Sequence, residues 1–552
     1  MFVLCSCFSN NRGIIHPCHF TRSILSDMSG RVGASILQRA YCSRISSAPA
    51  SSQCLPLAAF LSNHTTQRGQ YCHVSSWINT SPRTRSFSTH QDFDFQLSQL
   101  QINSLLRLNE QSVSVPEFDG RGLSSVRKFE SNQVAANTPN EDRRSAATCL
   151  QSKGMIFGVF DGHGGWACAQ AVSERLLYYI AVGMMPQQNL EELERCMEQG
   201  KAVPPILQWY KHHSDYNYRE SASLYIEHLR VFWQELLDCE EHGKGLSPSD
   251  VLDLAFKRLD ADISLEAQVP LSNSLMKSTA IQVAFAGCTA CVAHVGPDAI
   301  HVANSGDCRA VLGVQEEDGS WSALPLSWDH NAENPSEVAR IKAQHPQSET
   351  DTVITDERLL GILMPLRGFG DVRFKWSLEL QQNIISGLES TVDLDSLNMY
   401  NYIPPDYHSP PYLDVIPEIT HHKLRPQDRF LILATDGLWD ELSSKEAVQL
   451  VGEHLSGIHL QAPVTQTERR LKLGKLHELL LKRQARASPA LDTNVATHLI
   501  RQALGKGDYG ELSQQKLASV LSLPEDLARM YRDDITVTVV YLNSDLGRPH
   551  HG

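Results

Sequence analysis

The sequence predicts a mixed α/β protein in which strands alternate with long helices and acidic residues stand at the strand ends. Apolar runs of strand length lead into an aspartate at residues 155–160, before Asp161, and at 430–435, before Asp436. Residues 166–185 carry apolar side chains at helical spacing. Short apolar runs near glycines indicate buried strands, whereas a 3.6-residue period indicates a helix. This alternation excludes an all-helical protein but leaves the order of the strands open.

The segment 154–165, GMIFGVFDGHGG, is the strongest candidate for a site. An acid such as Asp161 is costly to bury at a strand end unless something replaces its hydration, and a divalent cation would do so. The glycines permit close approach of the backbone, and His163 can donate a proton near neutral pH. The alternative is a tight turn with a solvated aspartate and a surface histidine.

Other acids share this placement at the boundaries of strand-like runs. They are Glu141 and Asp142 after a turn-like TPN, Asp307 in HVANSGDCR, Asp436 and Asp440 in RFLILATDGLWD, and Asp533 and Asp534 in RDDITVTVVY. A set of carboxylates with almost no Cys or His partners suits Mg²⁺ or Mn²⁺ and argues against zinc.

Four further segments have predicted structure. Residues 95–109 suggest a short amphipathic helix, and 224–239 a helix whose apolar stripe packs in the core rather than serving as a docking face. Residues 281–295 predict two core strands around Gly287. A helix from about 335 to 343 is expected to carry Glu337 and Arg340 on its outer face.

Individual side chains also carry predictions. Cys288 and Cys291 match CxxC, but they lie in a strand-like run without a second pair, which favours buried thiols over zinc or redox chemistry. His330 is expected in a loop hydrogen-bond network rather than in catalysis. Ser443 and Glu446 form a capping box, so a helix should begin there.

The N-terminal region differs in composition from the rest. Residues 1–91 hold one acid, Asp27, against eight arginines and no lysine. An Arg-rich, Ser-rich and acid-poor start is typical of a mitochondrial transit peptide. We predict a transit peptide over residues 1–87, followed by an extension over 88–112. The alternative is a disordered cytosolic tail. The whole chain has net charge −14, which argues against nucleic-acid binding by charge. The longest uncharged apolar stretch, 281–295, is too short to span a bilayer.

Five motifs, in chain order, carry a resemblance to a known family. DGHGG, NSGDCRAVL, LRGFGD, ATDGLWDEL and RDDITVTVV resemble the motif series of the metal-dependent type 2C serine/threonine protein phosphatases. Longer stretches such as VPEFDGRGLSSVRKFESNQ and LPEDLARMYRDDITVTVVY are similar to the mitochondrial members that act on pyruvate dehydrogenase. The resemblance implies a four-layer α-β-β-α sandwich of two antiparallel sheets over residues 113–545, with helical insertions near 186–247 and 455–525 and a tail over 546–552.

The resemblance also implies two Mg²⁺ or Mn²⁺ ions in the active site. One would be held by Asp161, Asp436 and Asp533, and the other by Asp161, the carbonyl of Gly162 and Glu141. Asp142 would support the waters of the second ion.

A water bridging the two ions would attack phosphorus in line, and His163 would protonate the leaving serine oxygen. Asp307, Asp436 and Asp440 match a third, weaker metal position. Asp371, in the glycine-aspartate motif, receives no role.

One departure concerns the phosphate. Many family members carry an arginine at the position of Asn137, and the members that act on pyruvate dehydrogenase share the departure seen here. Arg143 or Arg144 is the candidate replacement.

The resemblance therefore implies a phosphoserine phosphatase of the mitochondrial matrix that acts on the α-subunit of pyruvate dehydrogenase and restores its activity. It also implies docking on the lipoyl-bearing acyltransferase core, with a regulatory subunit as a further candidate partner. Two alternatives stay open. One is an inactive binding module of the same fold, against which the intact set of carboxylates speaks; the other is a phosphatase of the same family for another matrix phosphoprotein.

Overall fold

The computed structural model describes residues 97–116, 124–215, 222–239, 245–269, 274–388, 403–456, 474–475, 492–507 and 510–543. The predicted transit peptide (1–87), residues 88–96 of the extension that follows it and the predicted tail (546–552) lie outside the described residues.

Two antiparallel β-sheets form the centre of the fold. The first has the order β1-β2-β15-β14-β8-β9, and the second β13-β7-β6-β4-β3-β5 with β12 paired to β6. The strands of the first sheet are β1 (Gln111–Ser114), β2 (Val126–Val134), β15 (Ile535–Leu542), β14 (Asp428–Ala434), β8 (Arg309–Gln315) and β9 (Trp321–Pro325). Those of the second are β13 (Glu418–Lys423), β7 (Ala299–Ser305), β6 (Gly287–Val295), β4 (Met155–His163), β3 (Arg143–Cys149), β5 (Leu207–Trp209) and β12 (Phe369–Gly370).

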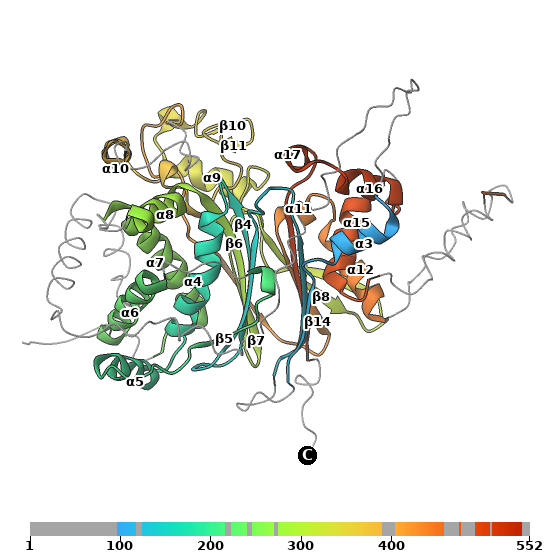
Figure 1. Ribbon diagram of the computed structural model, residues 1–552, viewed down its shortest axis with the longest axis horizontal. Coiled ribbons are helices and arrows are strands. Elements are labelled where there is room, and N and C mark those ends of the chain that lie inside the picture. The colour runs from blue at the N-terminus through green and yellow to red at the C-terminus, as the bar shows by residue number, and fades with distance from the viewer. Residues whose placement is uncertain are drawn as a thin grey trace, which may run out of the picture. The chain divides into compact units, whose positions relative to one another are not determined.

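Helices cover the outer face of each sheet (Figure 1). Against the second sheet lie α4 (Ala167–Gly183), α7 (Pro248–Gln268) and α8 (Ser274–Phe285), with α5 (Gln187–Glu198) and α6 (Ala222–Asp238) beyond them. Beside the first sheet lie α3 (Gln99–Leu106), α12 (Ser444–Ser456), α15 (Val495–Gly505) and α16 (Gln514–Leu521). The predicted α-β-β-α sandwich is confirmed.

The period-2 alternation of β14 shows where the core lies. Leu431 and Leu433 pack with residues of both sheets, including Phe157 of β4. Phe430 and Ile432 point to the other side and pack with α12 and α15. Since successive side chains of a strand face opposite ways, one strand contributes to two of the hydrophobic layers that hold the sandwich together.

Smaller elements complete the described chain. They are β10 (Ile354–Thr355), β11 (Arg358–Leu359), α9 (Pro335–Gln344), α10 (Leu378–Leu388), α11 (Asp436–Trp439), α17 (Glu525–Ala528) and three 3₁₀ turns, η3 (His213–Asp215), η5 (Gln347–Glu349) and η6 (Val372–Phe374). None of the helices in the described ranges has the length and apolar character needed to cross a membrane.

The prediction for residues 281–295 is wrong in its first half. Residues 281–285 end the helix α8, and the strand β6 begins at Gly287 itself. An apolar run of this length fits a buried helix as well as a buried strand, so periodicity alone could not separate them. Cys288 and Cys291 in β6 are buried free thiols, as predicted.

The orientation predicted for Glu337 is also wrong. α9 buries this side chain, which pairs with Arg340 on its own helix and with Arg367 from a distant segment. No neighbouring residue in the sequence indicates that Glu337 pairs with Arg367. A charged residue near the start of a helix is therefore predicted to face solvent. The Ser443–Glu446 capping box is confirmed by hydrogen bonds in both directions.

The predicted insertions contain more than helices. Within 186–247, α6 packs its stripe as predicted, with Phe232 and Trp233 buried, but the short strand β5 pairs with β3 and extends the sheet. Within 455–525, α15 and α16 are described, while 457–473 and 476–491 lie outside the described residues.

Candidate metal centre

Three strand ends bring carboxylates together. Asp161 lies near the end of β4, Asp307 follows β7, and Asp436 begins α11 just after β14. Each offers one oxygen, and these oxygens all lie within 4.8 Å of one another. Because β4 and β14 belong to different sheets, the cluster sits between the sheets at the end of the sandwich where α11 lies (Figure 1).

Burial and mutual repulsion make this cluster unfavourable without a cation. Burial, and then the charge of Asp436, raise the pKa of both Asp161 and Asp307 well above the usual range. Burial and the neighbouring Asp533 raise the pKa of Asp436 to about 6. Its Oδ1 is shielded from solvent and has no hydrogen-bond partner within the described ranges. An unsatisfied oxygen in a group of repelling carboxylates fits a hard cation.

The loop before β3 adds two further acids. Asp142 is buried and accepts a hydrogen bond from Thr435 Oγ1 at 2.8 Å, while its Oδ1 has no partner in the described part of the chain. Burial, and then Asp534, raise the pKa of Glu141. A Cβ on Gly162 would lie 2.5 Å from the carbonyl oxygen of Glu141. Glycine at this position therefore lets the end of β4 approach the loop, as the predicted metal ligands require.

Asp534 holds that loop in place. Its Oδ1 accepts from the backbone N–H groups of Ala136 at 2.5 Å and Asn137 at 2.8 Å. Its Oδ2 accepts from the Asn137 side-chain amide at 3.0 Å and from the Glu141 N–H at 2.8 Å. The sequence did not predict a separate role for Asp534. Its position directly after Asp533, in a pair of acids before a strand, was the available indication.

Asp533 and Asp440 lie beside the three-carboxylate cluster rather than in it. Asp533 pairs through Oδ1 with Arg529, and its charge raises the pKa of Asp436. Asp440 lies one helical turn after Asp436, and burial followed by Asp533 raises its pKa. Asp307 is thus grouped with Asp161 and Asp436, whereas the family resemblance implied a group of Asp307, Asp436 and Asp440.

His163 has a carboxylate partner. Its Nε2 lies 2.5 Å from Oδ2 of the buried Asp371, which has a positive φ of 48° and donates its backbone N–H to the Ala286 carbonyl at 2.9 Å. A Cβ on Gly287 would lie 1.9 Å from His163 Nε2 and 2.2 Å from Asp371 Oδ2. Burial by itself lowers the His163 pKa, but the charge and hydrogen bond of Asp371 outweigh it and raise that pKa.

The candidate phosphate-binding residues are engaged by the fold. Asn137 is tied to Asp534. Arg143 donates to Gln170 Oε1 at 2.5 Å and to the carbonyls of Asn140 and Asp142 at 2.7 Å.

Arg144 is buried and donates to Asn109 O at 2.8 Å and Ser131 Oγ at 3.2 Å. These contacts do not support a phosphate role for either arginine. His330 is buried, and its Nδ1 accepts from the Gly306 N–H at 3.1 Å, which fits the predicted loop network.

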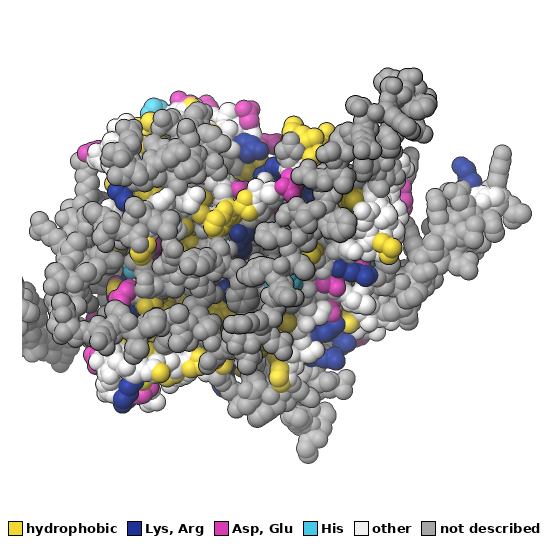
Figure 2. Space-filling view, viewed as in Figure 1, with side chains coloured by type: hydrophobic (Ala, Val, Ile, Leu, Met, Phe, Trp, Pro, Cys, Tyr) yellow, Lys and Arg dark blue, Asp and Glu magenta, His cyan; other side chains and the backbone are white. Residues whose placement is uncertain are grey.

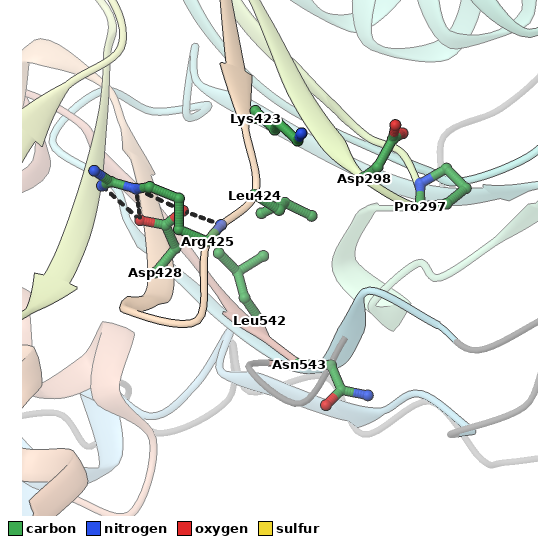
Figure 3. A pocket seen from close by; sticks show the side chains of 8 residues that line it. All are labelled: Pro297, Asp298, Lys423, Leu424, Arg425, Asp428, Leu542 and Asn543. Atoms are coloured by element: carbon green, nitrogen blue, oxygen red, sulfur yellow. Dashed lines mark hydrogen bonds and ion pairs between the residues drawn. The ribbon is translucent and has the colours of Figure 1, made fainter. Parts of the chain in front are cut away.

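A pocket at the other end of the sheets is separate from this cluster. Figure 3 shows its lining: Pro297, Asp298, Lys423, Leu424, Arg425, Asp428, Leu542 and Asn543. Asp428 starts β14, whereas Asp436 follows the end of that strand. Asp428 is paired with Arg425, as drawn, and with His422, so this carboxylate is already paired within the fold.

Comparisons with known proteins agree with the motif series. Residues 210–470 match the family described as Protein phosphatase 2C. The chain is 53% identical over 472 residues to the human protein named pyruvate dehydrogenase (acetyl-transferring) phosphatase 1, mitochondrial, covering 85% of this chain and 87% of that protein. It is 53% identical over 484 residues to the human form named phosphatase 2 of the same enzyme, covering 86% and 90%. A solved serine-threonine phosphatase 2C from Toxoplasma gondii is 18% identical with a TM-score of 0.37, over 79% of this chain and 99% of that one.

Proposed function

The chain belongs to the protein phosphatase 2C family, and from that premise we propose that it removes phosphate from serine of the pyruvate dehydrogenase α-subunit in the mitochondrial matrix. The observation that carries the proposal is the group of oxygens from Asp161, Asp307 and Asp436 within 4.8 Å. Three carboxylates this close together repel a negatively charged phosphate ester. The group can therefore act on such a substrate only when cations occupy it.

The chain's residues fit two Mg²⁺ or Mn²⁺ ions. Asp161, Asp436 and Asp533 would hold one, and Asp161, Glu141 and the Gly162 carbonyl the other. Asp142 would hold waters through its Oδ1, which has no hydrogen-bond partner among the described residues. Asp307 and Asp440 would serve a third, weaker position. When bound, such ions lower the pKa of a water and neutralise charge on a transferring phosphoryl group.

We assign proton donation to His163. The leaving serine oxygen is a strong base and needs a proton as the bond to phosphorus breaks. Asp371 occupies Nε2 of His163, so the proton for the leaving group would be carried by Nδ1. The charge and hydrogen bond of Asp371 raise the pKa of His163, which favours the protonated imidazole that an acid requires.

The relatives' names support the substrate and the compartment. Both human relatives are named as mitochondrial phosphatases of pyruvate dehydrogenase, and residues 1–87 have the composition of a transit peptide. We propose the lipoyl-bearing acyltransferase core and a regulatory subunit as further partners. A phosphatase for a different matrix phosphoprotein is the second candidate, because the cluster itself does not distinguish between phosphoserine substrates.

The test is phosphate release from phosphorylated pyruvate dehydrogenase complex, beside an unrelated phosphoserine protein, with Mg²⁺ and with EDTA. Mg²⁺-dependent release that favours the complex supports chemistry and substrate together. Equal release from both substrates would keep the chemistry and reject the substrate. No release from folded, metal-loaded protein would favour the binding module.

A pair of variants isolates the site. Asp161→Asn should abolish turnover, because this side chain is assigned to both ions. Asp253→Asn, which removes a surface carboxylate paired with Lys257 on α7, is the control and should retain activity. Wild-type activity from Asp161→Asn would overturn the two-ion assignment.

A further inference from the structure

Three large apolar side chains are exposed next to the metal centre. Leu527, Met530 and Tyr531, which we call the apolar ridge, are 41%, 77% and 70% exposed. They lie on α17 and the turn after it, within six residues of Asp533. Figure 1 shows α17 at the same end of the sandwich as α11, and in Figure 2 a hydrophobic surface lies over the position of α17. Exposed apolar groups gathered beside a candidate site mark a surface on which a ligand can bind.

The ridge is held in a fixed conformation. The Met530 N–H donates to the Leu527 carbonyl at 3.0 Å, and the Tyr531 N–H donates to the Ala528 carbonyl at 3.1 Å. Ala528 is buried and anchors the turn. The exposure therefore belongs to an ordered turn rather than to a loose segment.

Two arginines are interleaved with the ridge. Arg529 pairs through Nη1 with Asp533 while its side chain remains 49% exposed. A guanidinium has five N–H donors, so one such pairing leaves others for a ligand. Arg532 donates through Nη2 to the Ala135 carbonyl at 2.6 Å. Its Nε and Nη1 are shielded from solvent and have no hydrogen-bond partner within the described ranges.

We propose that this surface binds the substrate around its phosphoserine, with Arg529 contacting the phosphate and the apolar ridge holding an apolar side chain beside it. The proposal rests on the proposed phosphatase activity and adds a substrate class, a phosphoserine segment with an apolar residue beside the phosphoserine. Met530 and Tyr531 precede Asp533 by three and two residues in the chain, so the apolar ridge and this assigned ligand belong to one short segment.

Charge and area favour a short peptide over a folded partner. A phosphate dianion prefers planar guanidinium donors, and the predicted alternatives Asn137, Arg143 and Arg144 are engaged by the fold. Three side chains expose on the order of 300 Å², whereas a stable protein interface buries about 800 Å² on each partner.

The experiment compares three substrates on the full chain with Mg²⁺: p-nitrophenyl phosphate, a phosphoserine peptide with leucine on both sides of the phosphoserine, and the same peptide with serine there. Variants are Met530→Ser with Tyr531→Ser, Arg529→Ala and Arg529→Lys. The controls are Leu100→Ser on α3, where Leu100 is 79% exposed, and Arg195→Ala on α5, where Arg195 is 54% exposed and paired with Glu192. Calorimetric titration with inorganic phosphate gives a readout independent of turnover.

We expect the wild type to prefer the leucine peptide by about tenfold in KM, a gain typical of burying part of one apolar side chain. The double ridge variant should remove that preference and change KM for p-nitrophenyl phosphate less than twofold. Arg529→Ala should weaken phosphate binding and raise KM for all three substrates by about tenfold or more, and Arg529→Lys should restore part of the loss.

Equal KM for the two peptides in the wild type overturns the ridge assignment, and so does a double variant that affects p-nitrophenyl phosphate as strongly as the peptide. Unchanged phosphate affinity in Arg529→Ala overturns the role of Arg529. A loss in that variant that disappears at saturating Mg²⁺ would also overturn it, since Arg529 would then act through the ligand Asp533. Wild-type protein that hydrolyses none of the substrates would instead reject the proposed function.

Discussion

Replacement of Asp371 by asparagine should slow the release of serine more than the release of an aryl alcohol. The change keeps the shape of the side chain but removes the charge that faces His163 Nε2 at 2.5 Å. A hydrogen bond to a charged group contributes about 1.5–3 kcal/mol, and each 1.4 kcal/mol corresponds to a factor of ten. The expected loss in kcat on a phosphoserine peptide is therefore about 10- to 150-fold.

The pH profile provides a second readout. Asp371 raises the His163 pKa against the opposing effect of burial, so its removal should lower that pKa. An acid must be protonated to act, and activity falls as the pH rises through its pKa. The alkaline limb of kcat should therefore move to lower pH in Asp371→Asn.

The assay compares kcat for the phosphoserine peptide and for p-nitrophenyl phosphate, whose leaving group needs little protonation. His163→Gln provides the matched background, because two residues that act through one proton should not have additive effects. The double variant should be no slower than His163→Gln alone. Equal losses on both substrates, or full additivity with His163→Gln, would refute the assignment and leave Asp371 as a structural residue.

Three further predictions concern metal and stability. Asp436, with a pKa raised to about 6, binds protons more readily in the folded than in the unfolded chain. The metal-free protein should therefore lose stability as the pH rises from about 4 through 6. Added Mg²⁺ should raise the unfolding temperature most above pH 6. Asp534→Asn should raise the Mg²⁺ concentration for half-maximal activity about 10- to 100-fold, because it weakens the contacts that hold Glu141, and an unchanged value would contradict this role. Glu266→Ala should lower the free energy of unfolding in urea by about 3–5 kcal/mol, because it leaves the buried Arg175 without its two hydrogen bonds at 2.7 and 3.0 Å.

Local sequence predicted those parts of the site that have a local signature. Asp161 and Asp436 stand at the ends of apolar runs, and an acid at that position is unusual enough to indicate a candidate ligand. The sandwich itself was implied by the order of the motifs, because apolar alternation does not specify which strands pair. The α8 helix shows this limit directly, since its last residues read equally well as a strand.

Residues that act through distant partners had no such signature. In the sequence, Asp371 is only an acid after a glycine. The fold brings it into contact with His163, which lies 208 positions earlier in the chain. Asp534 likewise bonds to a loop nearly 400 residues away. Glu337 was misassigned for the same reason, as its partner Arg367 comes from another segment. Their roles depend on contacts that sequence spacing does not encode.

The candidate metal centre and the stability of the fold are consequently linked. The repulsion among Asp161, Asp307 and Asp436 must be balanced by the hydrophobic layers on either side of the sheets until cations bind. Cations that bind only the folded chain then stabilise it by an amount that grows with the logarithm of their concentration above the dissociation constant. Asp534 joins the two effects, because the hydrogen bonds that position Glu141 also fix the loop entering β3. A change in this loop should therefore alter metal affinity and folding stability together, whereas a change on the apolar ridge should alter neither.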